Sequence, residues 1–348
     1  MVLVFALFGA SSAASSHSRV ETPSRVIAVG DLHGDFEAWR SILLASGLAD
    51  SEGEWTGGDA VLVQMGDIAD RGPDSLKIIR DLQRLEKTAP VSGGRVIVLL
   101  GNHEAMNVIG DLRYVHPGEY VAFTDKRSKR RREATWRANR EAIEAAYAAL
   151  DPPLDADQAK ARWFAETPLG MLEHRRAWKP GGELGLWAAQ LPAIVRISGV
   201  LFAHGGLSIE RSTESIDAIN ARIRAAMEPG EAIDRSVIED PLGPLWYRGN
   251  LLRPAADDMR MPIEEELAQI LAHFGARRLV VAHTPSLKGI TESAGGRLIR
   301  IDTGISRYYG GPQSYLELIG TRAIAHTRDE GGEWQSRELA AASLEAAQ

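Results

Sequence analysis

The stretch that decides the fold is RVIAVGDLHG, residues 25–34, in which an apolar run ends at a glycine and Asp31 and His33 follow at once. The same form returns in DAVLVQMGDIADRG (59–72) and in RVIVLLGNHE (95–104). Runs this apolar are typical of strands that are buried on both faces in a parallel sheet. A polar motif therefore begins where each of three buried strands ends.

The segments between these strands have helical patterns, DFEAWRSILLASG (35–47) and PDSLKIIRDLQRLEK (73–87). Strand, helix, strand, helix, strand is the βαβαβ arrangement of an α/β fold. The three motifs recur at intervals of about 36 residues, which is one strand–helix crossover. We expect the motifs to share the carboxyl edge of one sheet, where open α/β sheets bind ligands.

Further strands are expected in residues 199–206, 277–285, 296–304 and 314–320. They follow one another closely, which favours a second, partly antiparallel sheet. The predicted fold class is therefore α/β, a sandwich of two mixed sheets that face each other and are flanked by helices. The tail after Gly331 is expected to be weakly helical or disordered.

Residues 113–190 interrupt the strand pattern and predict a helical insertion into a single catalytic domain of residues 19–348, where the insertion could form a lid over the site. Between Asp125 and Arg140 the insertion has eight basic and two acidic residues. Two interpretations stay open: a solvated helix face, or a basic rim that attracts an anionic substrate.

Composition limits the function classes. The chain has 348 residues, a formal net charge of −7, a pI of about 5.8 and no cysteine. These values exclude disulfides, thiolate catalysis and a Cys-based zinc site, and they argue against nucleic acid as a partner.

The N-terminal segment, residues 1–18, has a short apolar run followed by small residues, and we interpret it as a signal peptide. This implies a periplasmic or secreted protein without a membrane span. A cytoplasmic protein is the alternative, because the first arginine is Arg19 and the basic n-region is missing.

Side chains that bind metal ions gather at the predicted strand ends. A single histidine there is usually structural, but four of the nine histidines occupy such positions together with two aspartates and an asparagine. The candidate ligands are Asp31, His33, Asp67, Asn102, His204 and His283. Carboxylate, imidazole and amide groups suit Mn²⁺, Fe or Zn²⁺, and we expect Mn²⁺. Six ligands can hold two divalent ions if Asp67, on the middle motif, bridges them, and a water between the ions then becomes a nucleophile near neutral pH.

The motifs GDLHG, GDIADRG, GNHE, HGG (204–206) and AHTP (282–285), in this order, resemble those of the calcineurin-like metallophosphoesterases. GDIADRG with GNHE is similar to the phosphoprotein phosphatase branch. GPLWYRGN (243–250) and IDTGISRYYGG (301–311) resemble the Shewanella-like protein phosphatases most. Eukaryotic enzymes of this branch usually have Tyr or Val where this chain has Ile68 and Ala69, which we expect only to pack.

The resemblance implies a role for each motif residue. Asp31, His33 and Asp67 would hold the first ion, and Asp67, Asn102, His204 and His283 the second. His103 would donate a proton to the leaving oxygen, with Asp70 as its hydrogen-bond acceptor.

Further residues would bind the substrate phosphate or support the site. Arg71 and Arg248 would clamp phosphate oxygens, and Asn102 would assist them. Tyr308 or Tyr309 would face the site. Glu104 is expected to support the site without touching substrate.

The predicted function is a dinuclear phosphomonoesterase that acts on a phosphorylated protein or peptide, or on a small phosphomonoester. The phosphorylated residue would be tyrosine, serine or threonine, and a metal-bridging hydroxide would attack in line. One alternative is a phosphoanhydride hydrolase that cleaves dinucleoside tetraphosphates. Another is a catalytically inactive module that binds phosphorylated partners, although such a module would be expected to lack a ligand or His103.

Overall fold

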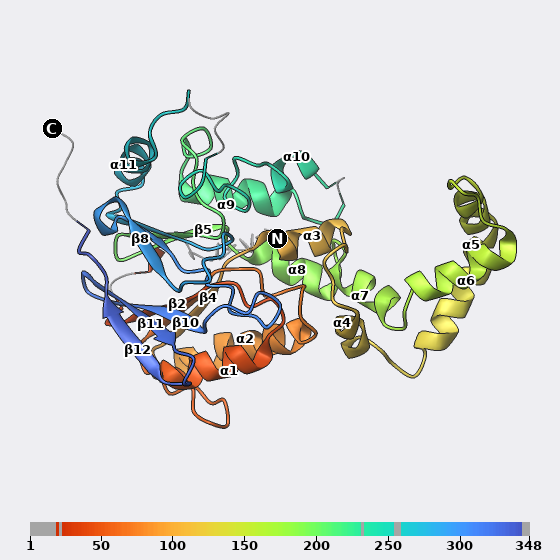
Figure 1. Ribbon diagram of the computed structural model, residues 1–348, viewed down its shortest axis with the longest axis horizontal. Helices are drawn as coiled ribbons and strands as arrows, with labels where there is room; N and C mark the ends of the chain where they lie inside the picture. The colour runs from red at the N-terminus through yellow and green to blue at the C-terminus, as the bar shows by residue number, and fades with distance from the viewer. Residues whose placement is uncertain (1–18, 21–22, 231–232, 254–258, 343–348) are drawn as a thin grey trace, which may run out of the picture.

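The computed structural model describes residues 19–20, 23–230, 233–253 and 259–342. The expected signal peptide, residues 1–18, lies outside this part of the chain. Two six-stranded mixed sheets face each other, and helices cover their outer sides (Figure 1). The predicted fold class is confirmed.

The first sheet has the strand order β12-β11-β10-β2-β3-β4. Strands β2, β3 and β4 are parallel, and β10, β11 and β12 extend the sheet in antiparallel fashion from β2. The bounds are β2 Val26–Val29, β3 Val61–Gln64, β4 Arg95–Val98, β10 Ser314–Ile319, β11 Arg322–Arg328 and β12 Trp334–Glu338.

The second sheet has the order β1-β5-β6-β7-β9-β8. Its central strands β6, β7 and β9 are parallel, β5 pairs with β6 and β8 with β9 in antiparallel fashion, and β1 is parallel to β5. The bounds are β1 Arg19–Val20, β5 Ile194–Ile197, β6 Val200–Ala203, β7 Arg278–Val281, β8 Thr291–Ser293 and β9 Leu298–Arg300.

Two sequence-based expectations about strands were wrong. Residues 314–320 belong to the first sheet, because β10 pairs with β2 and β11 and not with β9, the strand that precedes it in the sequence. The tail after Gly331 contains β12, an edge strand on β11. Its residues are mostly exposed, so neither an apolar run nor a clear alternation marks it in the sequence.

Alternate side chains of each central strand enter two different cores. In β2, Val26 and Ala28 face the other sheet, where they share a core with Phe202 of β6. Ile27 and Val29 face the helical side and share a core with the first two helices. Both faces of the strand are buried, which explains why its sequence is apolar without interruption.

Eleven α-helices and two short 3₁₀ segments complete the described part of the chain. The helices are α1 Phe36–Ala45, α2 Ser75–Thr88, α3 Asn102–Ile109, α4 Pro117–Ala122, α5 Ser128–Ala148, α6 Ala156–Glu166, α7 Met171–Trp178, α8 Glu183–Gln190, α9 Ile216–Ala225, α10 Arg235–Ile238 and α11 Ile263–His273. The 3₁₀ segments are η1 Ala89–Ser92 and η3 Ala294–Gly296. None of the helices described is both long enough and apolar enough to cross a membrane.

Helices α5 and α6 form an arm that projects away from the two sheets (Figure 1). The expectation of a lid over the site was wrong for this part of the insertion. Trp136 of α5 packs on Trp163 and Phe164 of α6, so the two helices bury their aromatic side chains against each other. At the base of the arm Arg131 forms an ion pair with Glu173 of α7.

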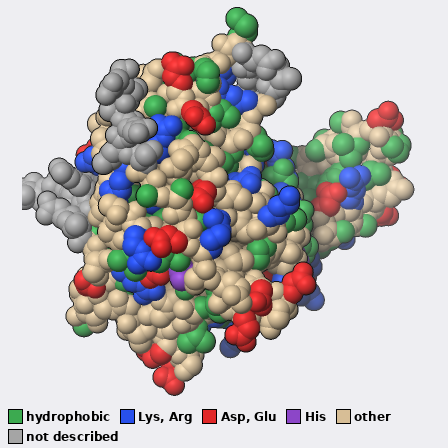
Figure 2. Space-filling model, turned by 60° about the vertical axis from the view of Figure 1, so that its left-hand side comes forward, with side chains coloured by type: hydrophobic (Ala, Val, Ile, Leu, Met, Phe, Trp, Pro, Cys, Tyr) green, Lys and Arg blue, Asp and Glu red, His purple; other side chains and the backbone are tan. Residues whose placement is uncertain are grey.

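The basic residues between Lys126 and Arg140 therefore lie on the arm and at its base. On the face of the molecule seen in Figure 2, positive and negative side chains are interspersed, and neither sign covers a large continuous area.

Phe202→Ala should lower the free energy of unfolding by about 3–5 kcal/mol, because it removes a ring from the core between the sheets and leaves a cavity. Phe202 is 0% exposed. Chemical denaturation measures the change. The control Leu186→Ala removes a side chain that is 43% exposed and should cost about 1 kcal/mol or less. Equal losses in the two variants would contradict the assignment of this core.

Candidate active site

At the carboxyl edge of β2, β3 and β4, the backbones of the three motif loops contact one another directly. The amides of Leu32 and His33 both donate to the carbonyl oxygen of Asp67, at 3.0 and 2.9 Å. A Cβ on Gly101 would lie 2.2 Å from the Asp67 nitrogen. Only glycine allows the third motif to approach the second this closely.

The carboxylate of Glu104 holds the second motif in place. One of its oxygens accepts from the amides of Ile68 and Ala69, both at 2.9 Å. The other accepts from the amides of Asp67 at 2.8 Å and Gly101 at 3.1 Å. Glu104 is fully buried, and burial and the nearby Asp67 charge raise the pKa of its carboxyl to about 7. It supports the site from behind, as the sequence predicts.

Several site residues have left-handed backbone conformations. Seven non-glycine residues have positive φ in the described part of the chain, and five of them lie in the motifs: His33, Asp67, Asp70, Arg71 and His283. Such conformations cost on the order of 1–3 kcal/mol each and persist only where the surroundings impose them. Here the hydrogen bonds between the loops impose them.

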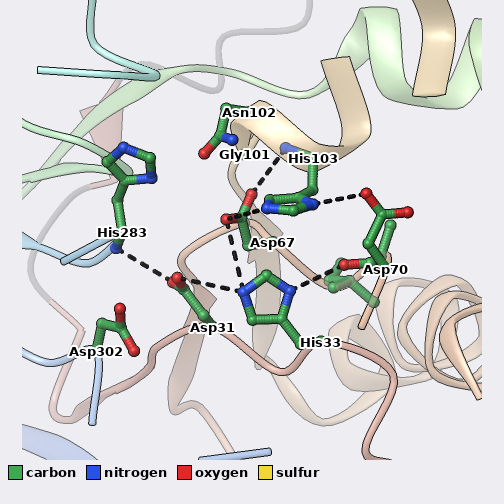
Figure 3. A network of polar contacts seen from close by, with 12 residues as sticks. Asp31, His33, Asp67, Asp70, Gly101, Asn102, His103, His283 and Asp302 are labelled. Atoms are coloured by element: carbon green, nitrogen blue, oxygen red, sulfur yellow. Dashed lines mark hydrogen bonds and ion pairs between the residues drawn. The ribbon is translucent and has the colours of Figure 1, made fainter. Parts of the chain in front are cut away.

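Asp67 lies at the centre, with His33 and His103 on one side and Asp31 and His283 on the other (Figure 3). It belongs to two buried groups of donor atoms, one with His33 and His103 and the other with His204 and His283, and within each group the atoms lie within 4.8 Å of one another. One carboxylate is thus shared by two potential metal sites.

The backbone orients the rings of two histidines. Nδ1 of His33 lies 3.0 Å from the Ala69 carbonyl oxygen, and Nδ1 of His204 lies 2.8 Å from that of Met65. A carbonyl oxygen only accepts, so each Nδ1 carries the proton, and in the neutral ring Nε2 presents a lone pair to the site.

The donor chemistry fits divalent metal ions. Nε2 of His204 lies 2.9 Å from Oδ1 of Asn102 and 3.3 Å from Oδ1 of Asp67, so three acceptor atoms converge. Nε2 of His283 is buried without a hydrogen-bond partner. Burial, and then repulsion from Asp302 and Asp67, raises the pKa of Asp31 well above its ordinary value. Cations at this place would relieve each of these unfavourable contacts.

Asp302 is a site residue that the sequence analysis missed. It is 2% exposed, lies beside Asp31, and burial raises the pKa of its carboxyl to about 6. The backbone N–H of Gly304 donates a hydrogen bond to Oδ1 of Asp302 at 2.9 Å. The signal was present, because Asp302 follows the apolar run of β9 as Asp31 follows that of β2.

His103 is bound to a second buried carboxylate. Its Nδ1 lies 2.6 Å from Oδ2 of Asp70, and Oδ1 of Asp70 accepts from Nδ2 of Asn107 at 2.9 Å. Burial opposes protonation of His103, but Asp67 and Asp70 outweigh burial and raise the pKa of the imidazole above its ordinary value. Its Nε2 lies 3.9 Å from Oδ2 of Asp67. The ring can therefore hold a proton at the centre of the site.

The predicted substrate-binding residues surround this centre. Arg71 donates to the Tyr308 hydroxyl at 3.1 Å, and Arg248 donates to the His283 carbonyl oxygen at 2.7 Å. The Tyr309 ring lies 5.4 Å from that of His33, so both tyrosines left open by the sequence border the site.

A pocket of about 300 Å³ opens beside His33. Its walls include Arg71, Tyr308 and His116. His116 belongs to the start of the insertion, so this end of the insertion, unlike the arm, reaches the site.

Comparison with known proteins agrees with this geometry. The calcineurin-like phosphoesterase family matches residues 24–287, and the chain belongs to this family. It is 31% identical to Shewanella-like protein phosphatase 2 of Arabidopsis thaliana over 83% of this chain and 73% of that protein. A solved cold-active protein tyrosine phosphatase superposes with a TM-score of 0.66 at 26% identity, covering 92% of this chain and 80% of that one. The cold-active protein-tyrosine phosphatase of a psychrophilic Shewanella species superposes with a TM-score of 0.65 at 25% identity, covering 92% and 82%.

The chain is therefore a hydrolase of phosphate esters, and the predicted family and enzyme class are confirmed. The inactive binding module falls away as an alternative.

Glu104→Gln should lower the free energy of unfolding by about 2–5 kcal/mol, because the amide nitrogen cannot accept from the two backbone N–H groups it would face. Hydrolysis of an aryl phosphate should fall as well, since the loop that holds Asp67 and Asp70 loosens. Denaturation and a rate assay measure the two effects. Glu37→Gln, at an exposed position on α1, is the matched control. Unchanged stability and rate would show that Glu104 does not organise the loop.

Proposed function

We propose that this protein is a phosphatase with two divalent metal ions that removes phosphate from phosphorylated proteins or peptides. The observation that carries the proposal is the position of Asp67, shared by two buried donor groups and 3.9 Å from the Nε2 of His103. The printed names of the relatives, protein phosphatase and protein tyrosine phosphatase, support the substrate class.

The resemblance to the family assigns the ligands of the two ions: Asp31, His33 and Asp67 would hold the first, and Asp67, Asn102, His204 and His283 the second. The positions of the donor atoms are compatible with this set, since Oδ2 of Asp31 and Oδ2 of Asp67 each lie 3.9 Å from Nε2 of His33, and His204 and His283 form the second group with Asp67. The donors suit Mn²⁺, Fe or Zn²⁺, and Mn²⁺ is the ion we expect. When bound, the two ions supply Lewis acidity toward the phosphate and lower the pKa of a water molecule that serves as the nucleophile.

His103 protonates the leaving oxygen. Asp70 fixes the ring through Nδ1, so Nε2 is the nitrogen that delivers the proton. An alkoxide or phenolate is a poor leaving group without a proton, and a general acid contributes typically about 10²–10⁴-fold to the rate.

Arg71 and Arg248 bind the phosphate oxygens. A guanidinium offers a permanent charge and two parallel N–H donors, which match the geometry of a phosphate. Both arginines lie at the rim of the site, where Arg71 lines the pocket beside His33 and Arg248 is held against the backbone of His283. Charge that builds up on the oxygens during transfer is stabilised there.

Phosphotyrosine is the substrate residue we favour. The pocket beside His33 adds room next to the phosphate site. Tyr308 places an aromatic ring in its wall, and the Tyr309 ring packs on that of Tyr308, with 4.9 Å between the ring centroids. Phosphotyrosine reaches further from the peptide backbone than phosphoserine and has a ring that packs on such a wall.

His103→Asn should lower kcat by about 10²–10⁴-fold, because it removes the proton donor. Both metal ions should remain bound, since His103 is not among the assigned ligands. Purified Mn²⁺-loaded protein is assayed with para-nitrophenyl phosphate, and its metal content is measured by elemental analysis. The matched control His326→Asn alters a histidine outside the site, on β11, which pairs with Glu317.

Loss of one ion in His103→Asn would make His103 a ligand instead of the acid. Failure of the unaltered protein to hydrolyse any phosphomonoester would contradict the proposed function itself.

A panel of matched peptides tests the substrate. The ratio kcat/KM should be higher for a phosphotyrosine peptide than for phosphothreonine and phosphoserine peptides of the same sequence, because the longer aromatic residue reaches the pocket wall. Diadenosine tetraphosphate is included in the panel. Faster cleavage of phosphothreonine would remove the tyrosine preference, and faster cleavage of the dinucleotide would replace the proposed substrate class.

A further inference from the structure

Arg71 holds its position without an acidic partner. Its guanidinium forms none of the ion pairs found in the described part of the chain, and its Nε is buried without a hydrogen-bond partner. An unpaired arginine is a mobile side chain that usually loses conformational freedom when it binds an anion. A residue that clamps phosphate should therefore be held in place by another means.

Two tyrosines provide that means. The centre of the Arg71 guanidinium lies 3.9 Å from the centroid of the Tyr114 ring and 4.8 Å from that of Tyr308. The Arg71 amide donates to the carbonyl oxygen of Tyr114 at 3.0 Å, and its Nη1 donates to the Tyr308 hydroxyl at 3.1 Å. Both the backbone and the side chain of Arg71 are therefore fixed by these two residues.

Aromatic rings hold a cation without neutralising it. A carboxylate partner would fix Arg71 equally well, but it would cancel the charge that the phosphate needs and compete for the same N–H donors. Stacking on a ring leaves the donor edge of the guanidinium available. The two tyrosines thus supply order and preserve the positive charge.

Tyr114 also touches the proton donor. Its ring centroid lies 5.2 Å from that of His103, with the planes tilted by 44°. Tyr114 stands near the start of the insertion, and no sequence motif marks it. One half-buried side chain from the insertion therefore contacts both the phosphate clamp and the general acid.

We propose that Tyr114 is a positioning residue, which holds Arg71 for phosphate binding by stacking beneath its guanidinium. The inference rests on the proposed function of Arg71 as a phosphate ligand. It assigns to the first residues of the insertion a direct part in the site.

The test is inhibition of the Mn²⁺-loaded enzyme by inorganic phosphate, with para-nitrophenyl phosphate as substrate. Loss of a cation–π contact predicts that Tyr114→Leu raises the inhibition constant and KM by roughly 5- to 20-fold. Tyr114→Phe keeps the ring and should stay within about twofold of the unaltered enzyme, since only the ring stacks on Arg71. The inhibition constant does not depend on the fraction of folded enzyme, so a merely structural role would not move it.

Three controls separate the outcomes. Tyr120→Leu makes the same substitution at a buried tyrosine on α4 that packs on His174; it should lower stability and leave the inhibition constant unchanged. In an Arg71→Ala background, Tyr114→Leu should have no further effect on the constant, because the group it positions is gone. Tyr308→Leu alters the ring on Arg71 that is 57% exposed, so it tests the clamp even if Tyr114→Leu fails to fold, and it too should raise the constant.

An unchanged inhibition constant in Tyr114→Leu, together with a raised constant in Arg71→Ala, would overturn the role of Tyr114 alone. The role would also be overturned if Tyr114→Leu failed to fold and Tyr308→Leu left the constant unchanged. Unchanged constants in both Arg71→Ala and Tyr114→Leu would show that Arg71 does not bind phosphate, which is a failure of the proposed function.

Discussion

The arrangement of the site depends on one buried carboxylate. Glu104 has no part in the proposed reaction steps. Its two carboxyl oxygens accept hydrogen bonds from four backbone N–H groups and thereby fix the loop that follows β3. That loop contains Asp67, Asp70 and Arg71, all in left-handed conformations that an isolated chain would avoid. The four hydrogen bonds that converge on this one carboxyl group offset the strain. Asp67, Asp70 and Arg71, to which we assign the bridging, proton-donor-partner and phosphate-binding roles, thus share one support.

The parts of the fold that follow from local pattern could be predicted from the sequence. Uninterrupted apolar runs marked β2, β3 and β4, and the helical periodicity between them marked α1 and α2. The convergence of the motifs followed from the rule that parallel strands end at one edge. Asp31, His33, Asp67 and Asn102 lie together for that reason. His204 and His283 follow β6 and β7 of the second sheet and reach the same place because the two sheets face each other. The ligand roles themselves remain our proposal.

Other features depend on contacts between distant parts of the chain. No local sequence pattern indicates that β10 pairs with β2. The residues of β12 are mostly exposed, so the strand has no apolar run that would predict it. The arm has a helical sequence, but the ion pair between Arg131 and Glu173 that joins its base to α7 is a contact that the sequence does not display. Asp302 had the same signal as Asp31 and was overlooked, whereas Tyr114 had none, because a tyrosine that stacks on an arginine has no characteristic spacing.

The arm has a consequence for how such a chain can diversify. Its two helices pack mainly on each other, and the chain leaves and re-enters the body between α4 and α7, which lie in contact: a Cβ on Gly170 would meet the Tyr120 carbonyl oxygen at 1.8 Å. Residues between these anchor points are separated from the strand ends that form the site. Evolution can therefore lengthen, shorten or recompose the arm as an independent module while the hydrolytic centre keeps its geometry.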